Sequence, residues 1–298
     1  MIIETKHLTK LYGNHTVLDD INLAVRQGSV YGLVGPNGAG KTTLLSIIAG
    51  LRQQSNGEVR VAVPKQHIAV CPDSPAFEPW LTALEVMQLA AGLVGVTRTT
   101  AELTDLLTEA GLGDAVDNKV GGFSRGMTQR LALATTIVAD PELIILDEPS
   151  SALDPRGRVE VLDMVARMGS RSTVIFSSHI LTDVQRVCDT IGVLKEGKLI
   201  YQGELRTFLD QNVNAVWEIH TRNVPTNFKR LLEKHDWVTE VKELAANTFH
   251  IEANSASEAE KQLAKAIGAT DAQLISIEPV DSDLEHAFLK LTQSGGNS

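Results

Sequence analysis

The sequence predicts an α/β fold in which a mostly parallel sheet carries a helical insertion and precedes a smaller α+β domain. In the first part of the chain, short β-branched runs alternate with helical patterns, which is typical of parallel sheets covered by helices. The strand pattern disappears at about 74–141 and changes again after about residue 212. We therefore predict domains at residues 1–211, with the helical part at about 74–141, and at residues 212–298.

The elements of the first domain follow from apolar runs and from helix start and stop signals. Thr82 and Glu85 form a capping box that opens a helix, and Gly50 ends an earlier one. The predicted inner strands are 30–34, 68–70, 143–146 and 173–177, and the predicted helices are 42–49, 82–93, 101–110 and 125–139.

The second domain repeats strand and helix signals in a different order. Strands are predicted at 213–220, 238–242, 248–253 and 273–277, and helices at 227–235, 257–267 and 284–291. The order βαββαβ, followed by a helix, resembles a ferredoxin-like split unit.

Composition limits the partners and the compartment. The 298 residues hold 27 Lys and Arg against 37 Asp and Glu, a formal charge of −10, which disfavours nucleic acid and anionic lipid as direct partners. No stretch approaches the ~20 apolar residues of a membrane-spanning helix, and the first residues lack a secretory signal. Cys71 and Cys188 lack metal-ligand spacing. We expect a cytoplasmic protein with reduced thiols.

A glycine-rich run between a predicted strand and a predicted helix matches the P-loop pattern. Glycines there let the backbone amides point into one concavity, and the following helix directs its positive end at the same place. Lys41 is expected to reach the β- and γ-phosphates, and the Thr42 hydroxyl to ligate Mg²⁺. The expected phosphate contacts are Gly35, Pro36, Asn37, Gly38, Ala39, Gly40, Lys41, Thr42 and Thr43. A glycine turn that binds nothing is the competing interpretation, which the two flanks disfavour. The first domain is thus predicted to be a P-loop NTPase.

Two adjacent carboxylates end the predicted strand 143–146. Asp147 is expected to hold Mg²⁺ through water, as the acid of such strands does in P-loop enzymes. Glu148 is placed to orient and deprotonate the attacking water. An exposed acidic strand end is the alternative, and the P-loop upstream argues against it.

The sequence disfavours a GTPase. A guanine-reading pattern would begin at Asn118, but Gly121 stands where it needs an aspartate. The residues after Asp147 are Glu-Pro-Ser, and the DxxG match at 154–157 lies downstream of the acid pair.

Residues 123–130, FSRGMTQR, resemble the signature motif of ABC ATPases, whose common form is LSGGQ. Ser124 and Gly126 match, whereas Arg125 and Met127 replace a glycine and a glutamine. Ser124 is also a good N-cap for the helix that follows, and a capped helix without any ligand is the competing interpretation. Because the P-loop already holds one ATP, the signature would contact an ATP held by a second subunit.

Further residues agree with this resemblance. Residues 151–154 resemble the D-loop, which packs between subunits, and His179 resembles the switch histidine that contacts the γ-phosphate. Tyr12 stands where the family stacks an aromatic ring on adenine, with core packing as the alternative. Asp73 occupies the place of the Q-loop glutamine, where it could still bind Mg²⁺ or water, with altered coupling to the membrane subunit.

The resemblance covers residues 1 to about 210 and is greatest to the single-domain ATP-binding subunits of drug, antibiotic and polysaccharide exporters. It implies a head-to-tail homodimer around two ATP, with Mg²⁺, attached to the inner face of the cell membrane only through a separate transmembrane permease. Phe77 and Trp80 lie where the family receives the permease, or else in the core of the helical part. The tail at about 277–291 also resembles that of exporter ATPases.

Two other functions compete. An ABC ATPase without a transport role would carry two ATPase units or long coiled-coil insertions, and neither pattern is present in the sequence. A non-hydrolysing module that works only in a heterodimer is left open by Arg125 and Asp73, although Glu148 and His179 argue against it.

Overall fold

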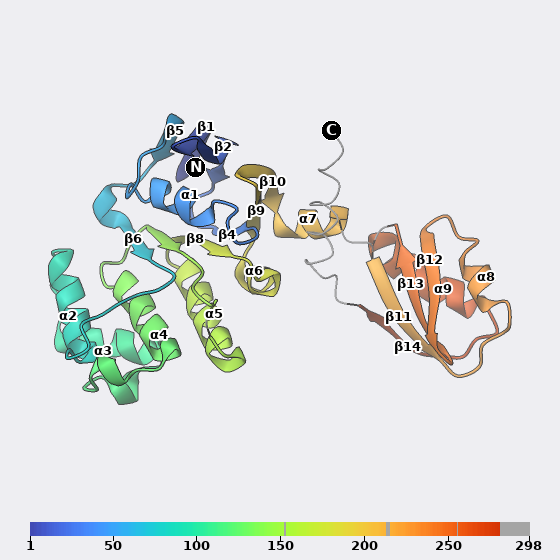
Figure 1. The fold of residues 1–298 in the computed structure, drawn as a ribbon. Helices are drawn as coiled ribbons and strands as arrows, with labels where there is room; N and C mark the ends of the chain where they lie inside the picture. Colours follow the sequence, from blue (N-terminus) through green and yellow to red (C-terminus); the bar gives the residue numbers. More distant parts are fainter. Residues whose placement is uncertain (152, 213–214, 255, 281–298) are drawn as a thin grey trace. The chain divides into compact units, whose positions relative to one another are not determined.

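The computed structural model describes residues 1–151, 153–212, 215–254 and 256–280. The chain divides into two compact units, Met1–Leu205 and Arg206–Ser298, and the division falls at the first residues of the helix α7 (Leu205–Asn212) (Figure 1). The domain boundary predicted after residue 211 falls at the other end of α7 and stays a prediction. None of the described helices is both long and apolar enough to cross a membrane.

The first unit is built on a six-stranded sheet in the order β10-β9-β4-β8-β7-β6. All neighbours are parallel except β9 and β10, which form an antiparallel hairpin. The strands are β4 (Val30–Val34), β6 (Ile68–Cys71), β7 (Leu143–Leu146), β8 (Thr173–Ser178), β9 (Thr190–Lys195) and β10 (Lys198–Glu204). The predicted parallel sheet is confirmed.

One predicted inner strand has a different place in this sheet. Residues 68–70 belong to β6, which is the edge strand beside β7. Burial fits an edge, because Ile68 and Ala69 are half-buried and Val70 is exposed, whereas every residue of β4 and β7 is buried. Apolar composition alone does not separate an edge strand from a central one.

The first unit also contains a second, antiparallel sheet, whose buried side chains are part of the unit's hydrophobic core. Its central strand β1 pairs with β2, β3 and β5. The bounds are β1 (Ile3–Tyr12), β2 (His15–Ile21), β3 (Ala24–Val25) and β5 (Asn56–Val61). None of these strands was predicted from the sequence.

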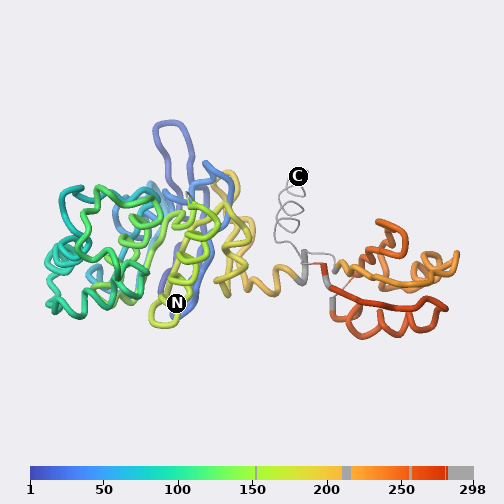
Figure 2. Tube along the Cα trace, turned by 90° about the horizontal axis from the view of Figure 1, so that it is seen from below, coloured from blue at the N-terminus to red at the C-terminus, as the bar shows by residue number. Residues whose placement is uncertain are grey.

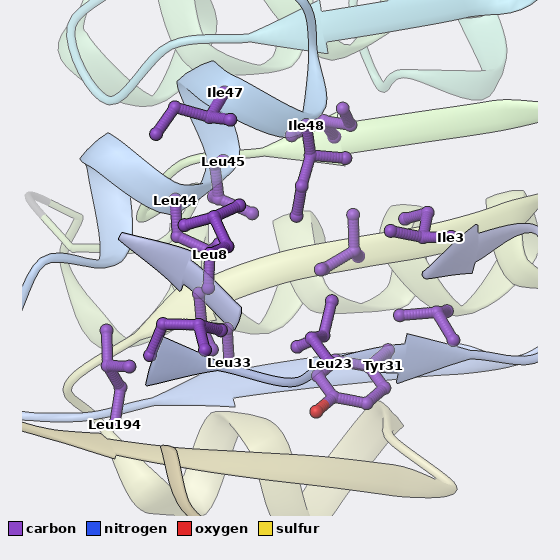
Figure 3. Close-up of a cluster of buried hydrophobic side chains, with 14 of the residues drawn as sticks. Ile3, Leu8, Leu23, Tyr31, Leu33, Leu44, Leu45, Ile47, Ile48 and Leu194 are labelled. Atoms are coloured by element: carbon purple, nitrogen blue, oxygen red, sulfur yellow. The ribbon is translucent and has the colours of Figure 1, made fainter. Parts of the chain in front are cut away.

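The helix α1 (Lys41–Ile48) lies between the two sheets. Leu44 and Leu45 of α1, Leu8 of β1 and Leu33 of β4 are buried in one hydrophobic cluster, and Figure 3 shows their side chains meeting between helix and strands. On the opposite face of the large sheet, α5 (Pro155–Gly169) contacts β8, and α6 (Leu181–Val187) contacts β4 and β8. Helices on both faces explain why the central strands are apolar throughout.

The helical part holds α2 (Ala83–Leu93), α3 (Thr100–Glu109) and α4 (Arg125–Thr136). These helices group on one side of the first unit in both ribbon and tube views (Figures 1 and 2). Residues 72–142 are all described and hold no strand, so the predicted helical insertion is confirmed. The predicted capping box is present, because the Glu85 amide donates to Thr82 Oγ1 at 3.2 Å and the Thr82 amide donates to Glu85 Oε2 at 2.8 Å. Thr99 and Glu102 form a second one at α3.

The second unit is a four-stranded antiparallel sheet in the order β12-β13-β11-β14, with its core on the side of α8 and α9. The elements are β11 (Ala215–Thr221), α8 (Phe228–Leu232), β12 (Val238–Ala245), β13 (Thr248–Ala253), α9 (Ala256–Gly268) and β14 (Leu274–Pro279). This is the predicted βαββαβ order in a split arrangement. The predicted final helix at 284–291 lies outside the described residues.

Candidate functional site

The glycine-rich loop joins the end of β4 to the start of α1. Gly38 and Gly40 have φ values of 81° and 104°, in the left-handed region that favours glycine. A Cβ atom on Gly40 would lie 2.8 Å from Leu18 Cδ2, and one on Gly35 would lie 2.3 Å from the carbonyl oxygen of Leu194. The three glycines are therefore required by backbone conformation or by close packing. Pro36, Asn37 and the buried Ala39 complete the loop.

Lys41 is the first residue of α1 and is buried. Its Nζ donates to the carbonyl oxygens of Gly35 at 2.7 Å and Pro36 at 3.2 Å, and it lies 3.0 Å from Glu148 Oε1. The helix has no side-chain cap and no acidic residue in its first turn, so its N-terminal amides and Lys41 together favour an anion in the loop.

The two carboxylates after β7 are fixed by a serine on the neighbouring strand. Ser177 of β8 is fully buried and donates from Oγ to Asp147 Oδ1 at 2.6 Å. The Glu148 amide donates to the same Oγ at 2.8 Å. Ser177 is not among the site residues predicted from the sequence. Its position at the carboxyl end of a strand predicted to lie in the same parallel sheet is the signal that could have found it.

Glu148 adopts an unusual backbone conformation for a residue other than glycine, with φ of 47°. Such strain persists where the surrounding structure holds it, and it is common at active sites. The side chain is 13% exposed and lies between two partners, with Oε1 3.0 Å from Lys41 Nζ and Oε2 2.8 Å from His179 Nδ1. Glu148 thus contacts both the P-loop lysine and the predicted switch histidine.

Lys41, Glu148 and His179 line one cavity of about 460 Å³, hereafter the phosphate cavity. Five segments that lie apart in the sequence supply its walls. The lining residues are Val17, Asn37, Gly38, Gly40, Lys41, Thr42, Thr43, Asp73, Glu148, Ser151 and His179. The structure therefore brings together most of the predicted phosphate contacts and catalytic residues. Of the three predicted metal ligands, Thr42 and Asp73 line the cavity and Asp147 does not.

Tyr12 is not one of the residues that line the phosphate cavity. Its side chain is 42% exposed, which rules out the alternative that it packs in the core. Arg52 Nη1 donates to the Tyr12 hydroxyl at 2.7 Å, and Lys10 Nζ lies 5.0 Å from the ring centroid. The ring is thus held by two cations while remaining accessible.

The residues that resemble the signature line a separate cavity of about 560 Å³, hereafter the signature cavity. Ser124 caps α4 as predicted, because its Oγ accepts from the Met127 amide at 3.3 Å. Arg125, Gly126 and Asp154 also line the cavity. The phosphate and signature cavities have no lining residue in common, so Ser124 and Gly126 are not part of the site that Lys41 occupies.

The aromatic residues of the segment before α2 differ in burial. Trp80 is 63% exposed, which excludes it from the core of the helical part, whereas Phe77 is half-buried. Of the two interpretations of this segment, a surface available to a partner therefore fits Trp80.

Both cysteine thiols are expected to be unreactive in the folded protein. Burial, followed by the charges of Asp147 and Asp73, raises the pKa of Cys71 to about 12, and burial raises the pKa of Cys188 above its ordinary value. Because the thiolate is the nucleophile, neither residue should react with a disulfide reagent at pH 8. Both should react after unfolding in guanidinium chloride, as measured by thiol titration. Fast labelling of the native protein would contradict this.

Comparisons with known proteins agree with this geometry. A family model described as ABC transporter matches residues 18–151. The uncharacterized ABC transporter ATP-binding protein YxlF of Bacillus subtilis (strain 168) is 35% identical over 246 residues, which cover 80% of this chain and 82% of that protein. The lantibiotic transport ATP-binding protein SrtF of Streptococcus pyogenes is 35% identical over 210 residues, or 68% of this chain and 91% of that protein.

A solved structure of the ATP-binding subunit of an ABC transporter is also similar. It matches with a TM-score of 0.64 and 28% identity, covering 70% of this chain and 92% of that one. The stretch that the family model matches includes the P-loop and the acid pair, Asp147 and Glu148. The chain belongs to the ABC transporter family, as one of its ATP-binding, ATP-hydrolysing subunits.

Proposed function

We propose that the chain hydrolyses Mg²⁺-ATP as one half of a head-to-tail homodimer and thereby drives export by a separate transmembrane permease. The observation that carries this proposal is the position of the Glu148 carboxylate at the phosphate cavity, within 3.0 Å of Lys41 and 2.8 Å of His179. A base beside a phosphate-binding lysine suits attack of water on a γ-phosphate.

In the proposed reaction each residue has one task. Lys41 and the first amides of α1 bind the β- and γ-phosphates, and His179 contacts the γ-phosphate. Glu148 orients the attacking water and accepts its proton. Ser177 holds the Glu148 backbone in the strained conformation that turns its carboxylate toward the cavity. Tyr12 offers an exposed ring on which adenine can stack.

The oxygen donors near the cavity fit Mg²⁺. Among the described residues, no group of three or more His, Cys, Asp or Glu is arranged to hold a metal ion by itself. This agrees with Mg²⁺, which is usually held by one or two carboxylates together with substrate phosphates. Thr42, Asp147 and Asp73 are the residues that would hold it. When bound, the ion neutralises charge that develops on the transferred phosphoryl group.

The separation of the two cavities supports a dimer. Because the signature cavity shares no residue with the phosphate cavity, Ser124 and Gly126 would complete the site of a second copy. ATP would then join the two copies, and loss of the γ-phosphate would release them.

Ser124→Asp tests the dimer without removing the helix cap. Aspartate caps helices as well as serine does, so we expect an unchanged melting temperature and unchanged ATP affinity at the P-loop. The new carboxylate would repel the triphosphate of the other copy. In the Glu148→Gln background, ATP should therefore shift the parent protein, but not the Ser124→Asp variant, to a dimer in size-exclusion chromatography with light scattering. An ATP-induced dimer of the aspartate variant would contradict the arrangement.

Similarity to transport proteins supports a permease partner and suggests a class of cargo. SrtF is named for lantibiotic transport, so a small toxic or antibiotic compound is the cargo that we propose. The exposed Trp80 offers an apolar contact for the permease, which would hold the chain at the inner face of the cell membrane. Capture of the tagged chain from native membranes should recover a membrane protein with several spans.

The purified chain alone should hydrolyse ATP when Mg²⁺ is present, and its failure to do so would favour the heterodimer alternative.

A further inference from the structure

A buried carboxylate outside the phosphate cavity connects three segments of the first unit. Asp183 belongs to the first turn of α6 and is 1% exposed. Its Oδ1 accepts from Arg158 Nε of α5, and its Oδ2 accepts from the hydroxyl of Ser150, which is itself 2% exposed. Arg158 also donates from Nη2 to Thr182 Oγ1 at 2.8 Å. Asp183 is not one of the residues that line the phosphate cavity, so any effect that it has on the reaction must pass through other side chains.

Ser150 follows Glu148 and Pro149 in a short turn that is closed on itself. The Ser151 amide donates to the Glu148 carbonyl oxygen at 3.2 Å, and the ring of the buried Pro149 fixes φ inside the turn. The start of the turn is held as well, because the Glu148 amide donates to Ser177 Oγ. A glutamate in the left-handed region persists only where its surroundings fix it. The hydrogen bond of Ser150 to the buried carboxylate fixes the other end of this turn.

The same carboxylate belongs to the segment that carries His179. This residue lies between the end of β8 and the start of α6, shortly before Asp183. Two hydrogen bonds close the segment, since the Ile180 amide donates to Ser178 Oγ at 2.9 Å and the Asp183 amide donates to the Ile180 carbonyl oxygen at 3.2 Å. One buried side chain therefore joins the turn of Glu148 to the segment of His179, whose side chains meet 2.8 Å apart.

A second ion pair between the same two helices lacks this connection. Asp163 Oδ1 of α5 and Arg186 Nη2 of α6 lie 2.9 Å apart, with both side chains about half exposed. The carboxylate of the Arg158–Asp183 pair is buried instead, and a buried ion pair is weak support for stability, because removing the charges from water offsets much of their attraction. The feature that distinguishes the buried pair is the hydrogen bond from Ser150.

We propose that Asp183 and Ser150 are positioning residues for ATP hydrolysis. Asp183, held by Arg158, keeps the turn of the base fixed against the segment of the switch histidine. The Glu148 carboxylate and the His179 imidazole thereby keep the relative placement that attack of water on the γ-phosphate requires. A displacement of about 1 Å in such a group can slow a reaction on the order of 10²-fold. Neither positioning residue contacts the nucleotide in this scheme, which rests on the proposed function.

Ser150→Ala is the decisive variant, because it removes a neutral hydroxyl and leaves the Arg158–Asp183 ion pair in place. We expect single-turnover hydrolysis of Mg²⁺-ATP to be about three- to tenfold slower than in the wild type, the range that one net hydrogen bond supports. Affinity for a fluorescent nucleotide should be unchanged, since the P-loop is intact. Asp183→Ala should slow hydrolysis at least as much. Asp163→Ala, which removes the surface ion pair between the same helices, should hydrolyse ATP at the wild-type rate.

The Glu148→Gln background separates positioning from a general loss of structure. If Ser150 acts through the Glu148 carboxylate, Ser150→Ala should slow the Glu148→Gln protein by less than about twofold, because residues that act as a unit are not additive. An equal slowing in both backgrounds, wild-type hydrolysis by Ser150→Ala, or a slow Asp163→Ala protein would overturn the proposal and leave the proposed function standing. The decision does not depend on whether Asp183→Ala folds. If Glu148→Gln hydrolyses ATP as fast as the wild type, the proposed function and the positioning role both fail.

Discussion

Glu148→Gln is expected to slow ATP hydrolysis roughly 10²–10⁴-fold, the contribution of a positioned general base. Glutamine keeps the shape of the side chain and can still contact His179, but it cannot accept a proton from the attacking water. Nucleotide binding should remain intact, because the P-loop and α1 are unchanged. Release of phosphate by the purified protein, measured beside a fluorescent-nucleotide titration, separates the two effects.

The same variant should accumulate as an ATP-bound dimer, since the nucleotide that joins the copies is no longer cleaved. Glu142→Gln is a matched control, because Glu142 precedes β7 whereas Glu148 follows it, and its side chain contacts His67 on the surface. The control should hydrolyse ATP at the wild-type rate. Unchanged turnover in Glu148→Gln would refute the assignment of the base.

Lys41→Ala is expected to abolish productive nucleotide binding. The variant removes the cation from the phosphate cavity, and it also leaves the Gly35 and Pro36 carbonyl oxygens without their donor. Both changes act on the loop that would cradle the phosphates. A fluorescent-nucleotide titration should show no saturable binding at concentrations that saturate the wild type.

A control for Lys41→Ala has to show that the fold survives. Lys229→Ala removes an exposed lysine from α8 in the second unit and should bind nucleotide normally. Circular dichroism of all three proteins should give the same helix and strand signals. Normal ATP affinity in a folded Lys41→Ala protein would mean that the glycine loop is not the phosphate site.

The parts predicted well from the sequence are those whose cause is local. The P-loop needs left-handed glycines within a few residues, and the capping box at Thr82 needs only Glu85. The βαββαβ order of the second unit follows from short strands joined by short connections. In each case the residues that decide the structure stand next to one another in the chain.

The missed parts depend on pairing between distant residues. The antiparallel sheet pairs β1 with β5, which lie more than forty residues apart in the sequence. The same two segments are joined by a hydrogen bond from the Leu11 amide to the Ser55 hydroxyl oxygen. β6 is an edge strand because, among the described residues, no strand other than β7 pairs with it in this sheet, and strand neighbours of this kind are set by the folded chain. The contacts of Glu148 with Lys41 and of Ser177 with Asp147 likewise need the folded sheet, so the sequence could predict the residue types of the site but not their mutual contacts.

The ion pair between Lys41 and Glu148 has a consequence for the resting protein. A buried ammonium group is unfavourable without a counter-ion, and Glu148 supplies one from the same chain. Phosphate oxygens would compete with this carboxylate for Lys41, so we expect nucleotide binding to weaken the ion pair. The group that accepts the proton would then be released by the substrate itself, which links activation of the base to the arrival of the phosphate.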